Sequence, residues 1–129
     1  MNKIFLNVAA ISGCLCVLLG AFAAHKLKET LPADAVSVFD TGVRYQFYHT
    51  FALLFTAILF EKFPNKLMRW SGICFIAGII LFSGSLYALT VLRIYDITGF
   101  DKIGIITPFG GTFFIAGWLL IFIGVTKKS

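Results

Sequence analysis

Three apolar stretches constrain the fold of this chain more than any other feature of its sequence. Residues 70–92 and 105–125 contain no charged side chain, and residues 4–24 contain only Asn7 and Ser12 as clearly polar members. A helix needs about 20 mostly apolar residues to cross the roughly 30 Å hydrocarbon core of a bilayer. Each of the three stretches is therefore predicted to be a transmembrane helix.

A fourth segment, residues 42–60, is also predicted to span the membrane, although it is less apolar than the other three. Residues 51–60 alone are too few to cross the bilayer, so the span must include Arg44, Gln46 and His49. The long side chain of Arg44 can place its charge at the membrane interface. An interfacial or re-entrant segment is the alternative interpretation.

The composition agrees with a membrane protein and excludes a soluble domain. Hydrophobic residues make up 59% of the chain and charged residues 13%, against roughly 25% charged in an ordinary soluble domain. Pro32 and Asp34 suit the first turn of a helix, so helix two is expected to begin near Pro32 with an interfacial segment. The predicted fold is all-α: residues 1–129 form one integral membrane domain, an antiparallel bundle of four transmembrane helices at residues 4–24, 42–60, 70–92 and 105–125.

Basic residues in one short loop indicate the orientation of the chain. Lys62, Lys66 and Arg69 lie between the second and third predicted spans, and cytoplasmic loops are enriched in lysine and arginine. We therefore expect this loop and both termini to be cytoplasmic. The net charge of +5 is explained by topology, and no soluble basic surface suggests nucleic-acid binding.

Small residues recur at helical intervals within the predicted spans. Such residues let helix backbones approach closely in a membrane, where apolar side chains alone do not drive association. We therefore expect them to form helix contacts, although a substrate path along the glycines is an alternative. The glycines assigned to packing are Gly13, Gly20, Gly84, Gly110, Gly117 and Gly124.

Polar residues gather at corresponding ends of the four predicted helices. Since neighbouring spans run in opposite directions, these ends meet on one side of the membrane, the outer side in the expected orientation. Polar side chains at membrane depth usually face the bundle interior or a wet cavity. The predicted cluster is either a ligand pocket or a plug of interhelical hydrogen bonds, and contains His25, Gln46, His49, Ser83, Ser85, Tyr87 and Thr107.

The sequence gives little sign of a catalytic or metal site. His25 and His49 are too few ligands for a convincing metal or haem site, and no acidic residue lies inside a span. The three cysteines all lie in apolar spans and are expected to behave as small hydrophobic residues. We therefore expect no metal and no cofactor, and the absence of a phosphate loop, a carboxylate pair and a serine elbow disfavours catalysis.

Four short motifs follow one another along the chain, and together they resemble a known family. They are Gly-Ala-Phe-Ala-Ala-His at residues 20–25, Gln-Phe-Tyr-His at 46–49, Phe-Ser-Gly-Ser-Leu-Tyr at 82–87 and Thr-Pro-Phe-Gly-Gly at 107–111, followed by Gly117 and Trp118. The chain is similar over nearly its whole length to small multi-pass membrane proteins of the YgdD/YwdK type. One departure is Ala23, where that pattern usually has glycine. The resemblance implies a bacterial inner-membrane protein with four helices and implies no activity.

The residues leave several functions open for a protein of this kind. The first is a non-enzymatic membrane protein whose polar cluster binds a small molecule, a lipid headgroup or a protein partner, as a homo- or hetero-oligomer or alone. The second is a structural or accessory subunit whose cluster only stabilises the bundle. A small transporter or channel is a further alternative, but the polar residues do not form a route across the whole membrane.

Overall fold

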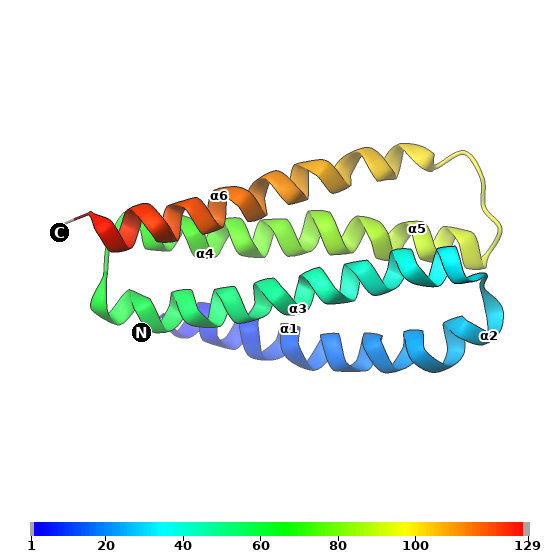
Figure 1. The fold of residues 1–129 in the computed structure, drawn as a ribbon, viewed down its shortest axis with the longest axis horizontal. Helices are drawn as coiled ribbons and strands as arrows, with labels where there is room; N and C mark the ends of the chain where they lie inside the picture. Colours follow the sequence, from blue (N-terminus) through cyan, green and yellow to red (C-terminus); the bar gives the residue numbers. More distant parts are fainter. Residues whose placement is uncertain (1, 128–129) are drawn as a thin grey trace.

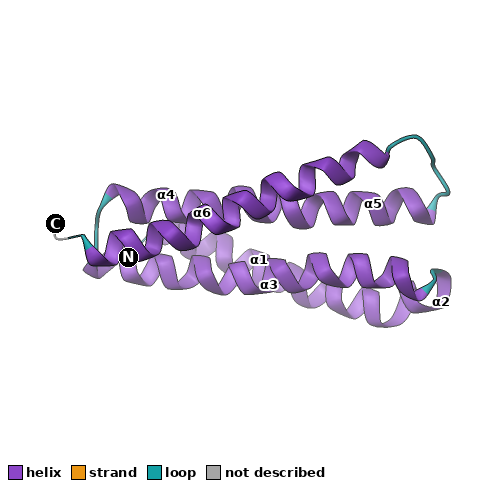
Figure 2. Ribbon diagram, turned by 45° about the horizontal axis from the view of Figure 1, so that its top comes forward, coloured by secondary structure: helices purple, strands orange, loops and turns teal. Residues whose placement is uncertain are grey.

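The computed structural model describes residues 2–127, which contain only helices and connecting loops (Figures 1 and 2). Four long helical rods lie side by side, and each runs opposite to the next along the chain. Their segments are α1 (Lys3–Phe22), η1 (Ala23–Leu27) and α2 (Lys28–Thr30); α3 (Ala33–Lys62); α4 (Lys66–Gly78), η2 (Ile79–Ser83) and α5 (Gly84–Ile94); and η3 (Asp101–Ile105) and α6 (Ile106–Thr126). The N and C termini lie at the same end as the α3–α4 loop.

Local sequence explains where the helices begin. The side chain of Asn2 accepts a hydrogen bond from the backbone N–H of Phe5 at 3.1 Å, and that of Asn65 accepts one from Met68 at 3.0 Å. Each thus satisfies a donor that the first turn of a helix leaves without a partner. Pro32 immediately precedes α3, so the expected start of helix two is confirmed.

Three of the four rods are long and apolar enough to cross a membrane, namely Lys3–Thr30, Lys66–Ile94 and Asp101–Thr126. The expectation of four such helices is met only in part, because α3 is as long as the others but less apolar. Its polar residues explain the difference: Gln46, His49, Thr50 and Thr56 are all buried against neighbouring helices. The segment that precedes the predicted span belongs to the same helix, since α3 is continuous from Ala33 to Lys62.

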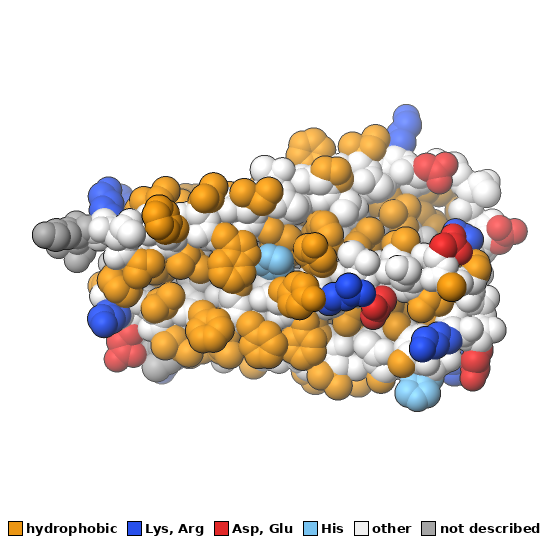
Figure 3. All heavy atoms as spheres, viewed as in Figure 1, with side chains coloured by type: hydrophobic (Ala, Val, Ile, Leu, Met, Phe, Trp, Pro, Cys, Tyr) orange, Lys and Arg blue, Asp and Glu red, His pale blue; other side chains and the backbone are white. Residues whose placement is uncertain are grey.

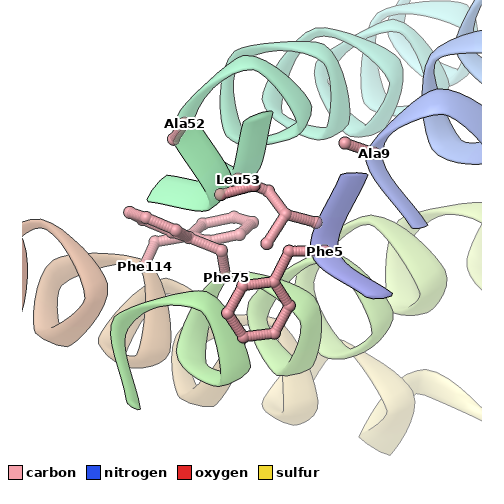
Figure 4. Close-up of a cluster of buried hydrophobic side chains, with 7 residues drawn as sticks. Phe5, Ala9, Ala52, Leu53, Phe75 and Phe114 are labelled. Carbon is pink, nitrogen blue, oxygen red and sulfur yellow. The ribbon is translucent and has the colours of Figure 1, made fainter. Parts of the chain in front are cut away.

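The main hydrophobic core draws on all four rods (Figure 4). Phe5 of α1, Leu53 of α3, Phe75 of α4 and Phe114 of α6 are buried together in this cluster. Large apolar side chains also cover the outside of the bundle, and Figure 3 shows them over its middle with charged groups gathered towards the two ends. This distribution is the one expected of a helical bundle surrounded by lipid.

The predicted glycine stripe on α6 forms a close helix contact. A methyl group added at Gly117 would lie 2.6 Å from the ring of buried Phe75, and one added at Gly110 would collide with the backbone of Phe82. A methyl at Gly124 would lie 3.4 Å from the side-chain oxygen of Asn65. The three glycines therefore face α4 and η2 along the whole length of α6.

The other glycines assigned to packing give a mixed outcome. Positions Gly13 and Gly20 lie at ordinary contact distance from Thr50 and Val43 of α3. The assignment is wrong for Gly84, where an added methyl group would meet nothing within 4 Å. The seven-residue spacing did not identify Gly72 as a packing glycine. The ring of Phe5 occupies the space that a side chain at this position would need.

Candidate functional site

A buried hydrogen-bond network joins three of the helical rods. Gln46 of α3 is its centre: the amide nitrogen donates to the backbone oxygen and hydroxyl of Ser12 at 3.2 and 3.1 Å. The amide oxygen of Gln46 accepts from the Tyr87 hydroxyl at 2.6 Å. Thr50 completes the network, because its hydroxyl lies 2.7 Å from that of Ser12 and donates to the backbone of Gln46. The network thus links α1, α3 and α5.

The side chain of His49 is held between α3 and α6. Its Nδ1 lies 2.7 Å from the carbonyl of Tyr45, and its Nε2 lies 3.1 Å from the indole nitrogen of Trp118. Because an indole N–H can only donate and a carbonyl can only accept, the imidazole is neutral with its proton on Nδ1. The ring stacks on Phe114 with centroids 3.5 Å apart. Both nitrogens are therefore committed to partners within the protein.

The serine and threonine residues of the predicted cluster form hydrogen bonds outside the Gln46 network. The hydroxyl of Ser83 donates to the backbone oxygen of Gly42 at 2.6 Å and so joins η2 to α3. The hydroxyls of Ser85 and Thr107 bond to each other, which joins α5 to the first turn of α6. Each of these three residues thus bonds to a neighbouring helix, but the three do not share one partner helix.

His25 does not belong with these residues. It is exposed, and its Nδ1 bonds to the carbonyl of Ala21 in its own helix at 2.9 Å. The expected position of the cluster, near one end of the bundle, is also wrong. Ser12 lies near the middle of α1, so the Gln46 network lies near the middle of the bundle. The predicted residues other than His25 therefore divide into groups centred on Gln46, His49 and the Ser85–Thr107 pair, and a separate bond from Ser83 to Gly42.

Sequence reasoning missed three residues that complete these groups, namely Ser12, Thr50 and Trp118. Ser12 was recognised as polar but was not included in the predicted cluster. One available signal was its position halfway along a span that otherwise contains only one clearly polar residue. Trp118 carried no such signal, because an aromatic residue within a span is equally compatible with contact to lipid.

The geometry does not provide ligands for a metal or a cofactor at His49. Its two ring nitrogens are both used, and His25 is bonded to its own helix on an exposed surface. Among residues 2–127, no three histidine, cysteine or acidic side chains lie close enough together to hold a metal ion. The polar groups can therefore join helices, and each of their buried side-chain nitrogen and oxygen atoms among the described residues has a hydrogen-bond partner.

Two surface grooves lie apart from the polar groups, towards the end of the bundle that carries the α2–α3 and α5–η3 loops. The larger has a volume of about 560 Å³ and lies between η1–α2 and the first turns of α3. The smaller, of about 270 Å³, lies between the start of α3, the end of α5 and the loop that follows it. Arg93 lines the smaller groove and pairs with Asp34 at 3.6 Å.

Long apolar helices, inward-facing polar side chains and lipid-compatible outer surfaces define a small multi-pass membrane protein. Residues 19–111 match the family model described as Protein of unknown function (DUF423). The chain therefore belongs to this family, whose curated members carry the name UPF0382 membrane proteins.

Relatives match the chain over nearly its whole length. It is 44% identical to a UPF0382 membrane protein of Haemophilus influenzae, over 100% of this chain and 98% of the relative. It is 40% identical to the UPF0382 membrane protein YwdK of Bacillus subtilis, over 97% and 98% of the two chains. It is 38% identical to the UPF0382 inner membrane protein YgdD of Escherichia coli, over 98% and 92%. No solved structure matches the chain.

Proposed function

We propose that this protein is a non-enzymatic structural or accessory protein of the bacterial inner membrane, which crosses the bilayer four times. In this proposal the buried polar groups act as interhelical locks. The observation that carries it is the complete pairing of the polar groups: no buried side-chain nitrogen or oxygen among the described residues lacks a hydrogen-bond partner. A ligand pocket would instead require polar atoms that are directed into an open space.

The length and surroundings of α3 support the fourth span. Its 30 residues correspond to about 45 Å of helix, longer than the roughly 30 Å hydrocarbon core. In Figure 1 it runs from one end of the bundle to the other beside α1. Its most polar buried side chains, Gln46 and His49, face protein rather than lipid. A helix of this kind can cross a bilayer with a lower overall hydropathy than its neighbours.

The basic α3–α4 loop supports a cytoplasmic position for both termini. Lys62 and Lys66 flank this loop, and Lys3 lies at the same end of the bundle. An excess of basic residues in short loops favours the cytoplasmic side. The inner-membrane location rests on the name of the Escherichia coli relative, which is called an inner membrane protein.

Reporter fusions test the number of spans and their orientation. An alkaline phosphatase reporter, which is active only outside the cytoplasm, and a fluorescent protein, which is bright only inside it, are fused after Ser129. The same pair is inserted between Thr30 and Ala33. We expect cytoplasmic signals at the terminus and external signals at the α2–α3 loop. A cytoplasmic C terminus together with a cytoplasmic α2–α3 loop would contradict the four-span topology.

Native mass spectrometry tests the locking role separately. The protein is purified in mild detergent as wild type and as Gln46→Met, and the small molecules that remain bound are weighed. We expect the two proteins to retain the same molecules, because the amide of Gln46 bonds to protein groups. Loss of a specific adduct from a folded Gln46→Met protein would show that the network is a binding site.

A further inference from the structure

We propose that the larger groove binds the headgroup of an aminophospholipid, a lipid that carries a phosphate and a primary ammonium group. The α1–α3 groove, as we call it, is lined on one wall by Gly20, Ala23, Ala24 and Lys28, and on the other mainly by Val36 and Asp40. This proposal goes beyond the locking role of the polar network, from which the groove is separate.

The groove lies at the depth where a lipid headgroup meets its acyl chains. Gly20 packs opposite Val43 of α3, and Gly20, Ala23 and Ala24 form the last turns of the apolar stretch at residues 4–24. Lys28 lies one further turn along the rod, beyond that stretch. The groove therefore continues from an apolar wall at hydrocarbon depth to a charged rim at the interface.

The shape of the groove results from small residues beside a buried apolar base. Ala23 and Leu27 are buried against Phe39 and Val43 of α3, so the two rods are firmly packed beneath the groove. Ala24, in contrast, is exposed and presents only a methyl group. The volume of about 560 Å³ is within the range of roughly 300–1,000 Å³ that is typical of small-molecule sites.

The charges at the groove are matched to a zwitterionic headgroup. Lys28 supplies a positive charge on one wall and Asp40 a negative charge on the other. One Asp40 oxygen accepts a hydrogen bond from Arg44 at 2.9 Å, which brings a second positive charge to the same place. A lipid phosphate pairs with Lys28 on one wall, and the ammonium of the headgroup donates to Asp40 on the other.

This arrangement also gives further polar partners to a charged pair on the surface of α3. Asp40 and Arg44 are about half exposed, and Arg44 lies one residue from Val43, which packs against the apolar part of α1. Charges that face acyl chains are costly unless they are paired or reach polar groups. A headgroup drawn into the groove supplies those polar groups. An anionic lipid without an amine would instead bring its charge towards the carboxylate of Asp40.

The experiment measures lipid binding to the full-length protein after it has been stripped of lipid in detergent. Native mass spectrometry gives the affinities for phosphatidylethanolamine, phosphatidylcholine and phosphatidylglycerol of the same acyl chains. Phosphatidylcholine has the same phosphate but its quaternary ammonium cannot donate a hydrogen bond. We expect phosphatidylethanolamine to bind about two- to fivefold more tightly than the other two lipids, a factor that corresponds to one exposed charge pair.

Matched variants identify the groove as the site. Asp40→Asn should abolish the preference for phosphatidylethanolamine. Lys28→Gln should lower the affinity for all three lipids about two- to fivefold. Ala24→Trp should fill the groove and block binding without disturbing the core, since Ala24 is exposed. Lys26→Gln and Asp34→Asn are the controls, because neither residue lines the groove, and both should bind as wild type does.

Four results would overturn the proposal. The first three are equal affinity for the three lipids, a preference for phosphatidylglycerol, and binding by Ala24→Trp that equals that of wild type. A dimer that covers the groove and excludes lipid would also overturn it, and would appear directly as doubled mass. Failure here leaves the locking role intact, because the Gln46→Met protein tests that role independently.

Discussion

At the scale of single residues, the organising feature is that most buried polar side chains have a partner on another helix, while Thr56 and Thr90 donate to carbonyls of their own helices. Gln46 shows this most clearly, since its amide binds Ser12 of α1 on one side and Tyr87 of α5 on the other. In lipid there is no water to replace a lost partner, so each such bond fixes how two helices meet. Polar residues in the middle of apolar segments therefore determine which helix faces meet.

Tyr87→Phe tests the value of one bond in this network. The substitution keeps the ring that packs against Phe39 but removes the hydroxyl, which leaves the amide oxygen of Gln46 buried without that donor. We expect the free energy of unfolding to fall by about 0.5–2 kcal/mol. Unfolding in mixed micelles with increasing dodecyl sulfate measures this. Tyr95→Phe is the control: Tyr95 is 71% exposed, and its substitution should change nothing.

The contact of His49 with Trp118 allows a second test. Trp118→Phe keeps an aromatic ring but removes the N–H that donates to Nε2 of His49, so a buried nitrogen loses its partner. We expect destabilisation of about 1 kcal/mol in the same assay. Trp70→Phe provides the comparison, because Trp70 is exposed on α4 and has none of these contacts. Equal stability of the Trp70 and Trp118 variants would show that the indole bond is unimportant.

At the scale of helices, the sequence predicted the elements better than their contacts. Apolar length and the proline at position 32 were enough to place all four helical rods, because these signals are local. The pairing of polar residues was harder to predict, since it depends on which faces of the helices meet. Gln46 and Tyr87 were expected together and are bonded, whereas His25 was expected with them and faces outward. Nothing in the local sequence distinguishes a histidine that faces inward from one that faces outward.

The glycines of α6 give a prediction at this scale. Gly117→Leu would push a large side chain into the buried ring of Phe75 and force α6 away from α4. Overpacking of this kind costs typically about 1–3 kcal/mol, which should lower the melting temperature in detergent. Gly84→Leu introduces the same side chain where nothing lies within 4 Å. We therefore expect it to melt near wild type, and a comparable loss in both variants would contradict the observed helix contact.

At the scale of the whole molecule, two helix contacts fix the register of the antiparallel rods. The hydroxyls of Ser12 and Thr50 meet between α1 and α3, and those of Ser85 and Thr107 meet between α5 and α6. Residues whose side-chain oxygens touch have β-carbons near the separation of about 3.5–4.5 Å that a disulfide requires. Paired cysteines at these positions should therefore form disulfides when the folded protein is treated with a mild oxidant.

The register can be measured by such cross-links in membranes. Cys14, Cys16 and Cys74 are free thiols and are first replaced by alanine. The pairs Ser12→Cys with Thr50→Cys and Ser85→Cys with Thr107→Cys are then oxidised mildly, unfolded and treated with a polyethylene-glycol maleimide. We expect both pairs to resist labelling until they are reduced. Ser12→Cys with Thr56→Cys is the mismatched control, because position 56 lies about 9 Å further along α3 than position 50. Preferential bonding of this control pair would show that α1 and α3 are aligned differently.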